Sequence, residues 1–336
     1  MAELPLRVAL IGCGGISRAH LEAWAAEPRA KVVYCVDVDE RRAREGAERV
    51  GARWHTDYRA VLDEVDAVDI CTPPHLHAEM SIAAAQAGKH ILCEKVMART
   101  LEEAEAMIRA AEEAKVVLMI AFLLRYRPEF QQFHDLCSSG QIGRLLQAYC
   151  QTSMYLSTIA PWRRNREQFP MGVFLSHGCH YVDQLQWHVG EITHAACFSH
   201  AMTFGDVIPG GEDTTVAIFR HANGAVSAYV ESWAIRYPLT PLRIDVYGSE
   251  GSARLDYHHD GRRTVEVWDA QGRRTLLEYR PQGPKEMEGQ IRHFVDCVLI
   301  GRTPLTDGRV GLQVMRIILA ACAGEREGRL KPVAEV

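Results

Sequence analysis

Short apolar runs alternate with amphipathic stretches through the first third of the chain. Uninterrupted apolar runs are typical of parallel strands that are covered on both faces, whereas apolar residues three and four positions apart form one face of a helix. The pattern predicts strands at 6–11, 32–36, 67–71, 90–93 and 116–121, and helices at 17–26, 40–50, 75–87 and 101–114. Regular strand–helix alternation builds a doubly wound α/β domain with right-handed crossovers.

The pattern changes after Phe122. Alternation of polar and apolar residues, which is typical of strands with one buried and one exposed face, now predominates. The pattern predicts a helix at 128–138 and strands at 147–155, 214–220, 225–232 and 242–247. We therefore predict two domains in the 336 residues: a doubly wound parallel-sheet domain at 1–122, and an α+β domain at 123–336 with a large, mostly antiparallel sheet.

A glycine turn directly follows the first predicted strand. Gly12, Gly14 and Gly15 are followed by Ile16, where the first helix begins. In Rossmann-type domains such glycines permit a sharp reversal and let the backbone approach a pyrophosphate, which also meets the N–H groups at the helix start. Ser17 stands where the third glycine of this motif usually lies, and its small side chain still allows close packing of the helix on the strand.

The second strand ends in Asp37, at the usual spacing for an acid that binds the adenosine ribose hydroxyls. Because a carboxylate repels a 2′-phosphate, we predict NAD as the cofactor. Arg41 and Arg42 follow closely, and they keep NADP possible if their loop turns inward.

Lys95 ends the run that starts at His90, a single amine at the end of an apolar strand. Ligands of open α/β sheets bind beyond the carboxyl ends of the strands, so a lysine there can face both cofactor and substrate. A phosphate-binding turn combined with this lysine predicts an oxidoreductase.

Composition excludes several classes of function. The net charge is only −5 and no basic stripe occurs, so we expect neither nucleic acid nor a membrane surface as a partner. The ten cysteines are scattered singly, and no secretory signal or membrane-length apolar run is present, which favours the reducing cytoplasm. His177, His180 and Asp183 have a spacing that metal ligands can use, but no further cluster clearly completes such a site, and we expect no metal.

The order of these motifs resembles the Gfo/Idh/MocA family of sugar and cyclitol oxidoreductases nearly from end to end. The glycine turn resembles the family's nucleotide turn, and Glu94-Lys95 matches its Glu-Lys-Pro signature. Residues 178–183 match the Gly-x-His-x-x-Asp core of its catalytic helix. Three further segments resemble family segments: Thr72-Pro73 with His77, the run from Arg125 to Pro128, and Trp162-Arg163.

The resemblance implies a role for each of these residues. The implied catalytic residues are Lys95, His180 and Asp183. The residues expected to face the substrate are Lys95, Trp162, Arg163, Ser176, His177 and His180. The implied cofactor contacts are Gly12, Gly14, Gly15, Ile16, Asp37, Thr72, Pro73, His77, Glu94, Lys95 and Arg125.

The chain departs from the family pattern at two positions. Val96 stands where the family has proline, so the restraint that proline places on the preceding residue is missing. Ser176 stands where family enzymes commonly carry an aspartate that contacts substrate and steadies the histidine. Asp183, three residues after His180, is the carboxylate expected to take over that second task.

These residues suit the oxidation of a secondary alcohol. The hydroxyl proton needs a base that titrates near neutral pH, as histidine does, while Lys95 holds the hydroxyl and stabilises the developing alkoxide. We predict hydride transfer between nicotinamide and a secondary hydroxyl of a sugar, sugar derivative or cyclitol. Two alternatives stay open: an NAD-dependent glycoside hydrolase or lyase that oxidises a ring carbon transiently, and a cofactor-binding sensor without turnover. A homodimer or homotetramer formed through the C-terminal sheet is expected, because an open sheet face is commonly buried against another subunit.

Overall fold

The computed structural model describes residues 5–156, 165, 168, 172–205, 211–281 and 286–336. Internal contacts divide the chain into two compact units. The first unit consists of Met1–Tyr126 and Gly283–Leu312, and the second consists of Arg127–Gln282 and Gln313–Val336. The first unit therefore includes a segment from late in the chain.

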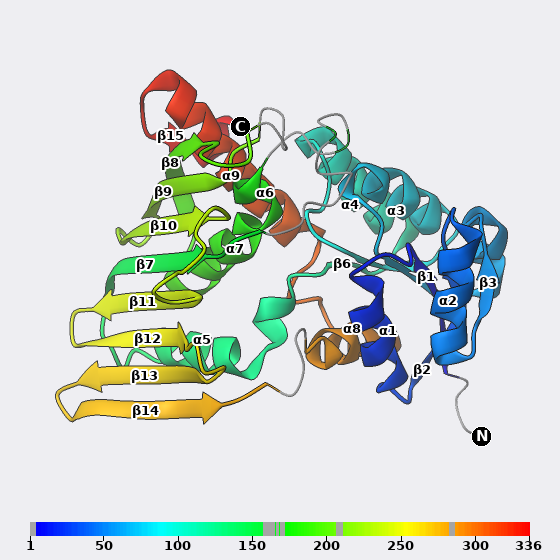
Figure 1. Ribbon diagram of the computed structural model, residues 1–336, viewed down its shortest axis with the longest axis horizontal. Helices are drawn as coiled ribbons and strands as arrows, with labels where there is room; N and C mark the ends of the chain where they lie inside the picture. Colours follow the sequence, from blue (N-terminus) through cyan, green and yellow to red (C-terminus); the bar gives the residue numbers. More distant parts are fainter. Residues whose placement is uncertain (1–4, 157–164, 166–167, 169–171, 206–210, 282–285) are drawn as a thin grey trace. The chain divides into compact units, whose positions relative to one another are not determined.

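The first unit is built on a six-stranded sheet in which every neighbouring pair is parallel (Figure 1). In spatial order the strands are β3 (Arg53–His55), β2 (Ala30–Val36), β1 (Leu6–Ile11), β4 (Ala67–Ile70), β5 (His90–Cys93) and β6 (Leu118–Ile120). The chain starts in the middle of the sheet and moves outward first on one side and then on the other. The order therefore reverses between β1 and β4, and the predicted doubly wound fold is confirmed.

Helices cover both faces of this sheet (Figure 1). On one face lie α1 (Ser17–Ala25), α2 (Glu40–Val50) and α8 (Glu288–Ile300), and on the other lie α3 (His77–Gln86) and α4 (Leu101–Ala114). Val8, Leu10 and Leu92 are completely buried between the layers, which explains why these strands are mostly apolar. The late segment is held by packing: Phe294 of α8 meets Trp24 of α1 edge to face, with ring centroids 6.1 Å apart.

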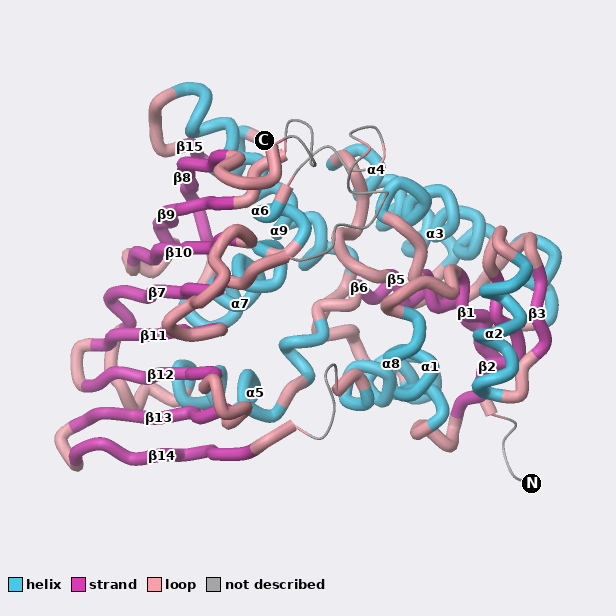
Figure 2. The backbone as a smooth tube through the Cα atoms, viewed as in Figure 1, coloured by secondary structure: helices cyan, strands magenta, loops and turns pink. Residues whose placement is uncertain are grey.

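The second unit contains a nine-stranded sheet (Figure 2). Its strands, in spatial order, are β14 (Gly272–Tyr279), β13 (Arg263–Asp269), β12 (Gly251–Tyr257), β11 (Leu242–Gly248), β7 (Leu145–Ser153), β10 (Val226–Ser232), β9 (Thr214–His221), β8 (Ile192–His200) and β15 (Lys331–Pro332). All neighbouring pairs are antiparallel except β7 with β10, which is parallel. The prediction of a mostly antiparallel sheet is confirmed.

Helices pack on one face of the second sheet. They are α5 (Pro128–Ser138), α6 (Val173–Ser176), α7 (Gly178–Val189) and, reaching into this unit from its start in the first, α9 (Gly308–Glu327). Strand β9 shows the resulting asymmetry, because Ala217 and Phe219 are buried while Val216 and Ile218 between them are exposed. Across the described residues, every helix is too short or too polar to cross a lipid bilayer.

Candidate functional site

The predicted cofactor residues of the first unit lie beyond the carboxyl ends of its strands. The glycine turn follows β1, Asp37 follows β2, Thr72 and Pro73 follow β4, and Glu94 and Lys95 follow β5. Parallel strands bring all these ends to one edge of the sheet, and ligands of such folds bind where the strand order reverses. Here the reversal lies between β1 and β4.

Gly12 allows the turn after β1 to pass close to the loop after β4. Its φ is +94°, and a Cβ atom at this position would lie 2.8 Å from both the Cys71 carbonyl carbon and the Thr72 nitrogen. A larger residue would therefore meet rigid backbone in a conformation that only glycine adopts readily.

Gly14 and Gly15 have a different role in the same turn. Cβ atoms added to them would meet no heavy atom within 4 Å, so the backbone here can be approached closely from outside. The hydroxyl of Ser17 donates to the Gly14 carbonyl at 2.6 Å and steadies the turn. Helix α1 then begins without a side-chain cap and without an acidic residue in its first turn. Its N–H groups and positive dipole end fit a pyrophosphate.

Asp37 is anchored so that its carboxylate borders the glycine turn. Oδ2 accepts the Cys13 backbone N–H at 2.8 Å, and Oδ1 accepts the Asp39 backbone N–H at 2.9 Å. Each carboxylate oxygen can accept a further hydrogen bond, as recognition of a ribose diol requires. The residues present fit a dinucleotide whose adenosine ribose carries free hydroxyls.

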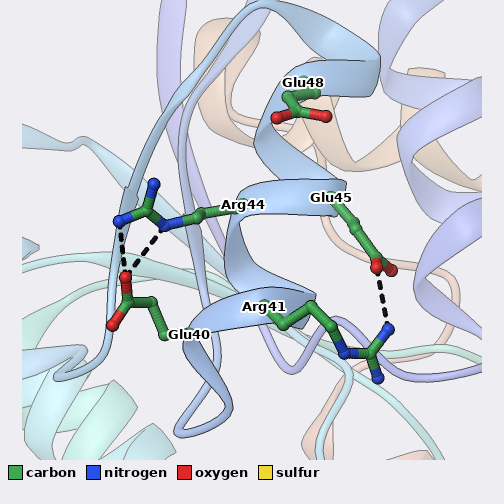
Figure 3. A pocket seen from close by; sticks show the side chains of 5 residues that line it. All are labelled: Glu40, Arg41, Arg44, Glu45 and Glu48. Carbon is green, nitrogen blue, oxygen red and sulfur yellow. Dashed lines mark hydrogen bonds and ion pairs between the residues drawn. The ribbon is translucent and has the colours of Figure 1, made fainter.

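The arginines that follow Asp37 are already paired with acids. Figure 3 shows the hollow on the outer surface of α2, where Arg41 points to Glu45 at 2.7 Å and Arg44 to Glu40 at 2.5 Å. Arg42 lies 3.4 Å from the Asp39 carboxylate. These side chains are largely exposed, so the hollow is a solvated helix surface, and its acids offset the positive charge that a 2′-phosphate would need.

Glu94 belongs to a buried polar cluster that the sequence patterns did not reveal. Its Oε1 lies 3.0 Å from His20 Nε2, and its Oε2 accepts the Lys95 backbone N–H at 3.1 Å. The other ring nitrogen of His20 lies 2.7 Å from Asp69 Oδ2, which also accepts the indole N–H of Trp24 at 2.7 Å. The cluster thus joins α1, β4 and β5 beneath the predicted cofactor loops, and it holds the backbone that carries Lys95.

The groups around His20 determine its charge state. Burial opposes a charged imidazole, but Asp69 and then Cys71 raise the pKa of His20 well above its ordinary value. A protonated ring can donate to both carboxylates. Within the described residues, His20, Asp69 and Cys71 also form a group whose potential metal-ligating atoms lie within 4.8 Å of one another. Since burial raises the pKa of the Cys71 thiol and hydrogen bonds engage the other two groups, internal hydrogen bonding accounts for the cluster.

His77 and Arg125 contact backbone carbonyls. The buried ring of His77 places Nδ1 2.9 Å from the Val96 oxygen and Nε2 2.8 Å from the Thr72 oxygen, so it links the loops after β4 and β5. Arg125 is also buried and donates to the Leu305 carbonyl at 3.1 Å. Both residues shape the loops that carry the predicted cofactor contacts, and their own contacts to a cofactor stay predictions.

The predicted catalytic histidine lies in the second unit, near the start of α7. His180 and Ser176 are buried, as is Asp183, which accepts a hydrogen bond from the Gln184 side chain at 3.1 Å. The helix does not run through from Ser176, because α6 ends there and α7 begins at Gly178, with His177 between them. Trp162 and Arg163, the remaining predicted substrate residues, lie outside the described residues.

A carboxylate that the sequence patterns did not identify faces this break. Glu231 on β10 is buried, and it contacts His177 Nδ1 through Oε1 and the Tyr229 hydroxyl through Oε2. The rings of His177 and His180 lie edge to face, with centroids 6.3 Å apart. Alternation along the strand gave no signal for it: Glu231 is the single charged residue of β10, but it shares a face with Ser227, opposite the apolar positions 226, 228 and 230.

Comparisons with known proteins found a matching family model for each of the two units. Residues 6–122 match a family model described as an oxidoreductase family with an NAD-binding Rossmann fold, and residues 130–254 match a GFO/IDH/MocA C-terminal domain. D-apiose dehydrogenase of Paraburkholderia graminis is 30% identical over 96% of this chain and 88% of its own length. Levoglucosan dehydrogenase of Pseudarthrobacter phenanthrenivorans is 32% identical over 75% of this chain and 74% of its own length. A solved levoglucosan dehydrogenase in complex with NADH and levoglucosan has a TM-score of 0.89 and 26% identity, covering 98% of this chain and 99% of that one.

Proposed function

Because this chain belongs to the Gfo/Idh/MocA family of NAD-binding oxidoreductases, we propose that it transfers a hydride between NAD and a secondary hydroxyl of a sugar, sugar derivative or cyclitol. One observation carries this proposal. The edge of the parallel sheet that presents the open glycine turn also carries Lys95, whose backbone is held by the buried Glu94 cluster. A cofactor-binding turn after β1 and an amine after β5, at the same edge of the sheet, are the parts that such a reaction needs.

Lys95 and His180 are proposed as the acid/base pair. When bound, the nicotinamide supplies the carbon that accepts or gives the hydride. Lys95 would hold the reacting hydroxyl and stabilise negative charge on its oxygen, and His180 would exchange the proton. Asp183 is proposed as a buried acid that steadies the helix segment around His180, and the cofactor contacts are those predicted at the strand ends.

NAD is the expected coenzyme. The two oxygens of Asp37 border the turn where the ribose hydroxyls are expected, and a 2′-phosphate there would be repelled. The pairing of Arg41 and Arg42 with acids of their own segment supports the same preference, while leaving weaker use of NADP possible.

A coupled assay tests the proposal against the two alternatives. Purified protein is incubated with NAD and single candidate substrates that include levoglucosan, D-apiose and myo-inositol, while absorbance at 340 nm and sugar products are followed together. We expect NADH to accumulate in proportion to oxidised product. Product without net NADH would indicate the transient-oxidation hydrolase or lyase, and NAD binding without any product would indicate the sensor. We favour neither alternative, since the relatives named above are dehydrogenases.

We also propose that the chain forms a homodimer or homotetramer through its second sheet. The face away from the helices presents Val216, Ile218, Val226 and Phe198 to solvent, and exposed apolar side chains that gather on adjacent strands are typical of a contact surface. Light scattering after size exclusion tests this: Ile218→Lys should shift the mass toward the monomer, and an unchanged mass would contradict the proposed surface.

A reducing compartment is proposed as well, because no disulfide joins any of the ten cysteines.

A further inference from the structure

The break between α6 and α7 places His177 against a buried carboxylate, and a glycine makes this possible. A Cβ atom on Gly178 would lie 2.8 Å from the Phe174 ring, 3.1 Å from the Tyr229 ring and 3.2 Å from Glu231 Oε2. Only a residue without a side chain lets the start of α7 come this close to β10. The preceding residue, His177, is thereby brought within hydrogen-bond reach of Glu231.

The contacts of Glu231 determine which nitrogen of His177 carries the proton. Burial, followed by the charge of Glu231, raises the pKa of Tyr229 well above its ordinary value, so the Tyr229 hydroxyl stays protonated and donates to Oε2. Glu231 is then an acceptor on both oxygens. A neutral His177 must donate from Nδ1 to Oε1, and its Nε2 then presents a lone pair.

The side chain of His177 is accessible to solvent, whereas that of Glu231 is buried. The side chain of His177 is 22% exposed and that of Glu231 is 1% exposed. Among the residues that the structure describes, none forms a hydrogen bond with Nε2 of His177. An oriented imidazole with a buried carboxylate behind it and an accessible nitrogen in front is an arrangement suited to proton exchange. The other ionisable groups around this pair are His180 and Tyr181 on α7, Tyr229 on β10, Cys150 on β7, and Arg127 and Glu212.

We infer that His177, oriented by Glu231, is a further catalytic residue: its Nε2 binds the reacting hydroxyl and takes up the proton that this hydroxyl loses, in place of His180. The inference rests on the proposed function. In the oxidation direction the O–H bond breaks, the proton forms a new bond to Nε2, and the electron pair left on oxygen closes the carbonyl. The hydride leaves carbon for NAD, so the alcohol is oxidised and NAD is reduced. The imidazolium that results is stabilised by Glu231, a carboxylate supplied from β10 where helix position 176 has only a serine.

Two variants and a matched control test the inference on a substrate that the wild-type enzyme turns over. His177→Asn keeps an amide that can donate to Glu231 but has no nitrogen in the place of Nε2. It should lower kcat by about a hundredfold or more and remove the acidic limb of the kcat/KM profile. Glu231→Gln keeps the shape and removes the charge. A less stabilised imidazolium loses its proton more readily, so the acidic limb should move to lower pH by about one unit or more.

The matched control is His259→Asn, an exposed histidine of the same unit whose ring contacts the Leu239 carbonyl. It should leave rate and profile unchanged. Affinity for NAD should stay the same in all three variants, because the cofactor residues lie in the first unit. Unchanged far-UV circular dichroism and melting temperature would show that the second unit is folded in each protein. If His177→Asn does not fold, Tyr229→Phe still tests the inference. It removes the hydrogen bond that partly neutralises the Glu231 carboxylate, so it should move the acidic limb to higher pH, opposite to Glu231→Gln.

An active enzyme whose acidic limb is the same in wild type, Glu231→Gln and Tyr229→Phe would overturn the inference and leave the proposed function standing. Rates of His177→Asn within about threefold of wild type, with the limb retained, would overturn it in the same way. Absence of turnover by the wild-type protein on every substrate would overturn both.

Discussion

Replacing Asp69 by asparagine tests the buried cluster under the cofactor loops. Asp69 and His20 are completely buried, and Oδ2 of Asp69 receives hydrogen bonds from the His20 ring and the Trp24 indole. Asparagine has nearly the same shape, but it can accept only through one oxygen and carries no charge. His20 would then face only Glu94, and burial would disfavour its charged form.

The expected loss of stability is about 3–5 kcal/mol, which is typical when one partner of a buried ion pair is removed. Asp66→Asn is the matched control, because Asp66 precedes the same strand and pairs with Arg7 at 2.7 Å on the surface, where the two side chains are 37% and 49% exposed. A solvated pair of this kind contributes only about 0–1 kcal/mol. Asp69→Asn should therefore be destabilised far more than Asp66→Asn.

The effect of Asp69→Asn should depend on pH in a defined direction. The folded protein raises the pKa of His20 above its unfolded value of about 6.5. A raised pKa contributes stability that is fully present below the unfolded pKa and is lost as the pH rises through the folded pKa. His77, His90, His221 and His293 have lowered pKa values because of burial and act in the opposite direction, but their contribution cancels between wild type and variant.

Urea denaturation, followed by tryptophan fluorescence and far-UV circular dichroism at pH 6 and pH 9, measures both the loss of stability and its dependence on pH. The difference in unfolding free energy between wild type and Asp69→Asn should be larger at pH 6 than at pH 9. Equal differences at the two pH values, or a loss at pH 6 no greater than that of Asp66→Asn, would refute the assignment of a protonated His20 between two carboxylates.

Four further substitutions concern the cofactor edge of the first unit. Asp37→Ala should narrow the preference for NAD over NADP, and calorimetric titration of both cofactors checks this; tighter binding of NADP by the unchanged protein would contradict the assignment. Gly14→Val should abolish NAD binding in a protein that still folds, since a Cβ atom at position 14 meets no other protein atom. Gly12→Ala should instead lower the free energy of unfolding by at least about 1–2 kcal/mol, because Gly12 has a positive φ and lies close to the backbone of the next loop. Similar melting temperatures for the two glycine variants would contradict this distinction. Lys95→Ala should reduce turnover by about a hundredfold or more while NAD affinity changes far less, and steady-state rates close to wild type would show that Lys95 is not the positioned amine.

The sequence by itself determined the architecture of the first unit and most of its cofactor edge. Strands covered on both faces are mostly apolar, so β1, β4 and β5 were visible as runs, and the end of each run located a loop that carries predicted cofactor residues. The turn around Gly12 was equally visible, because its positive φ demands a residue that the chain shows directly. Strand β3 was missed, since it has only three residues and they are largely exposed.

Only the tertiary structure decided which distant residues meet. His20 is 49 positions from Asp69 and 74 from Glu94, and His177 is 54 positions from Glu231. Periodicity describes neighbours on one helix or strand, and it contains no information about pairs that come together only when separate elements pack. Two further features could be seen only in the tertiary structure: α8 returns to the first unit, and β7 pairs with β10 in parallel. Buried charges such as Glu231 and Asp69 became interpretable only after packing supplied their partners, because a charge inside a protein is stable only beside the group that compensates it.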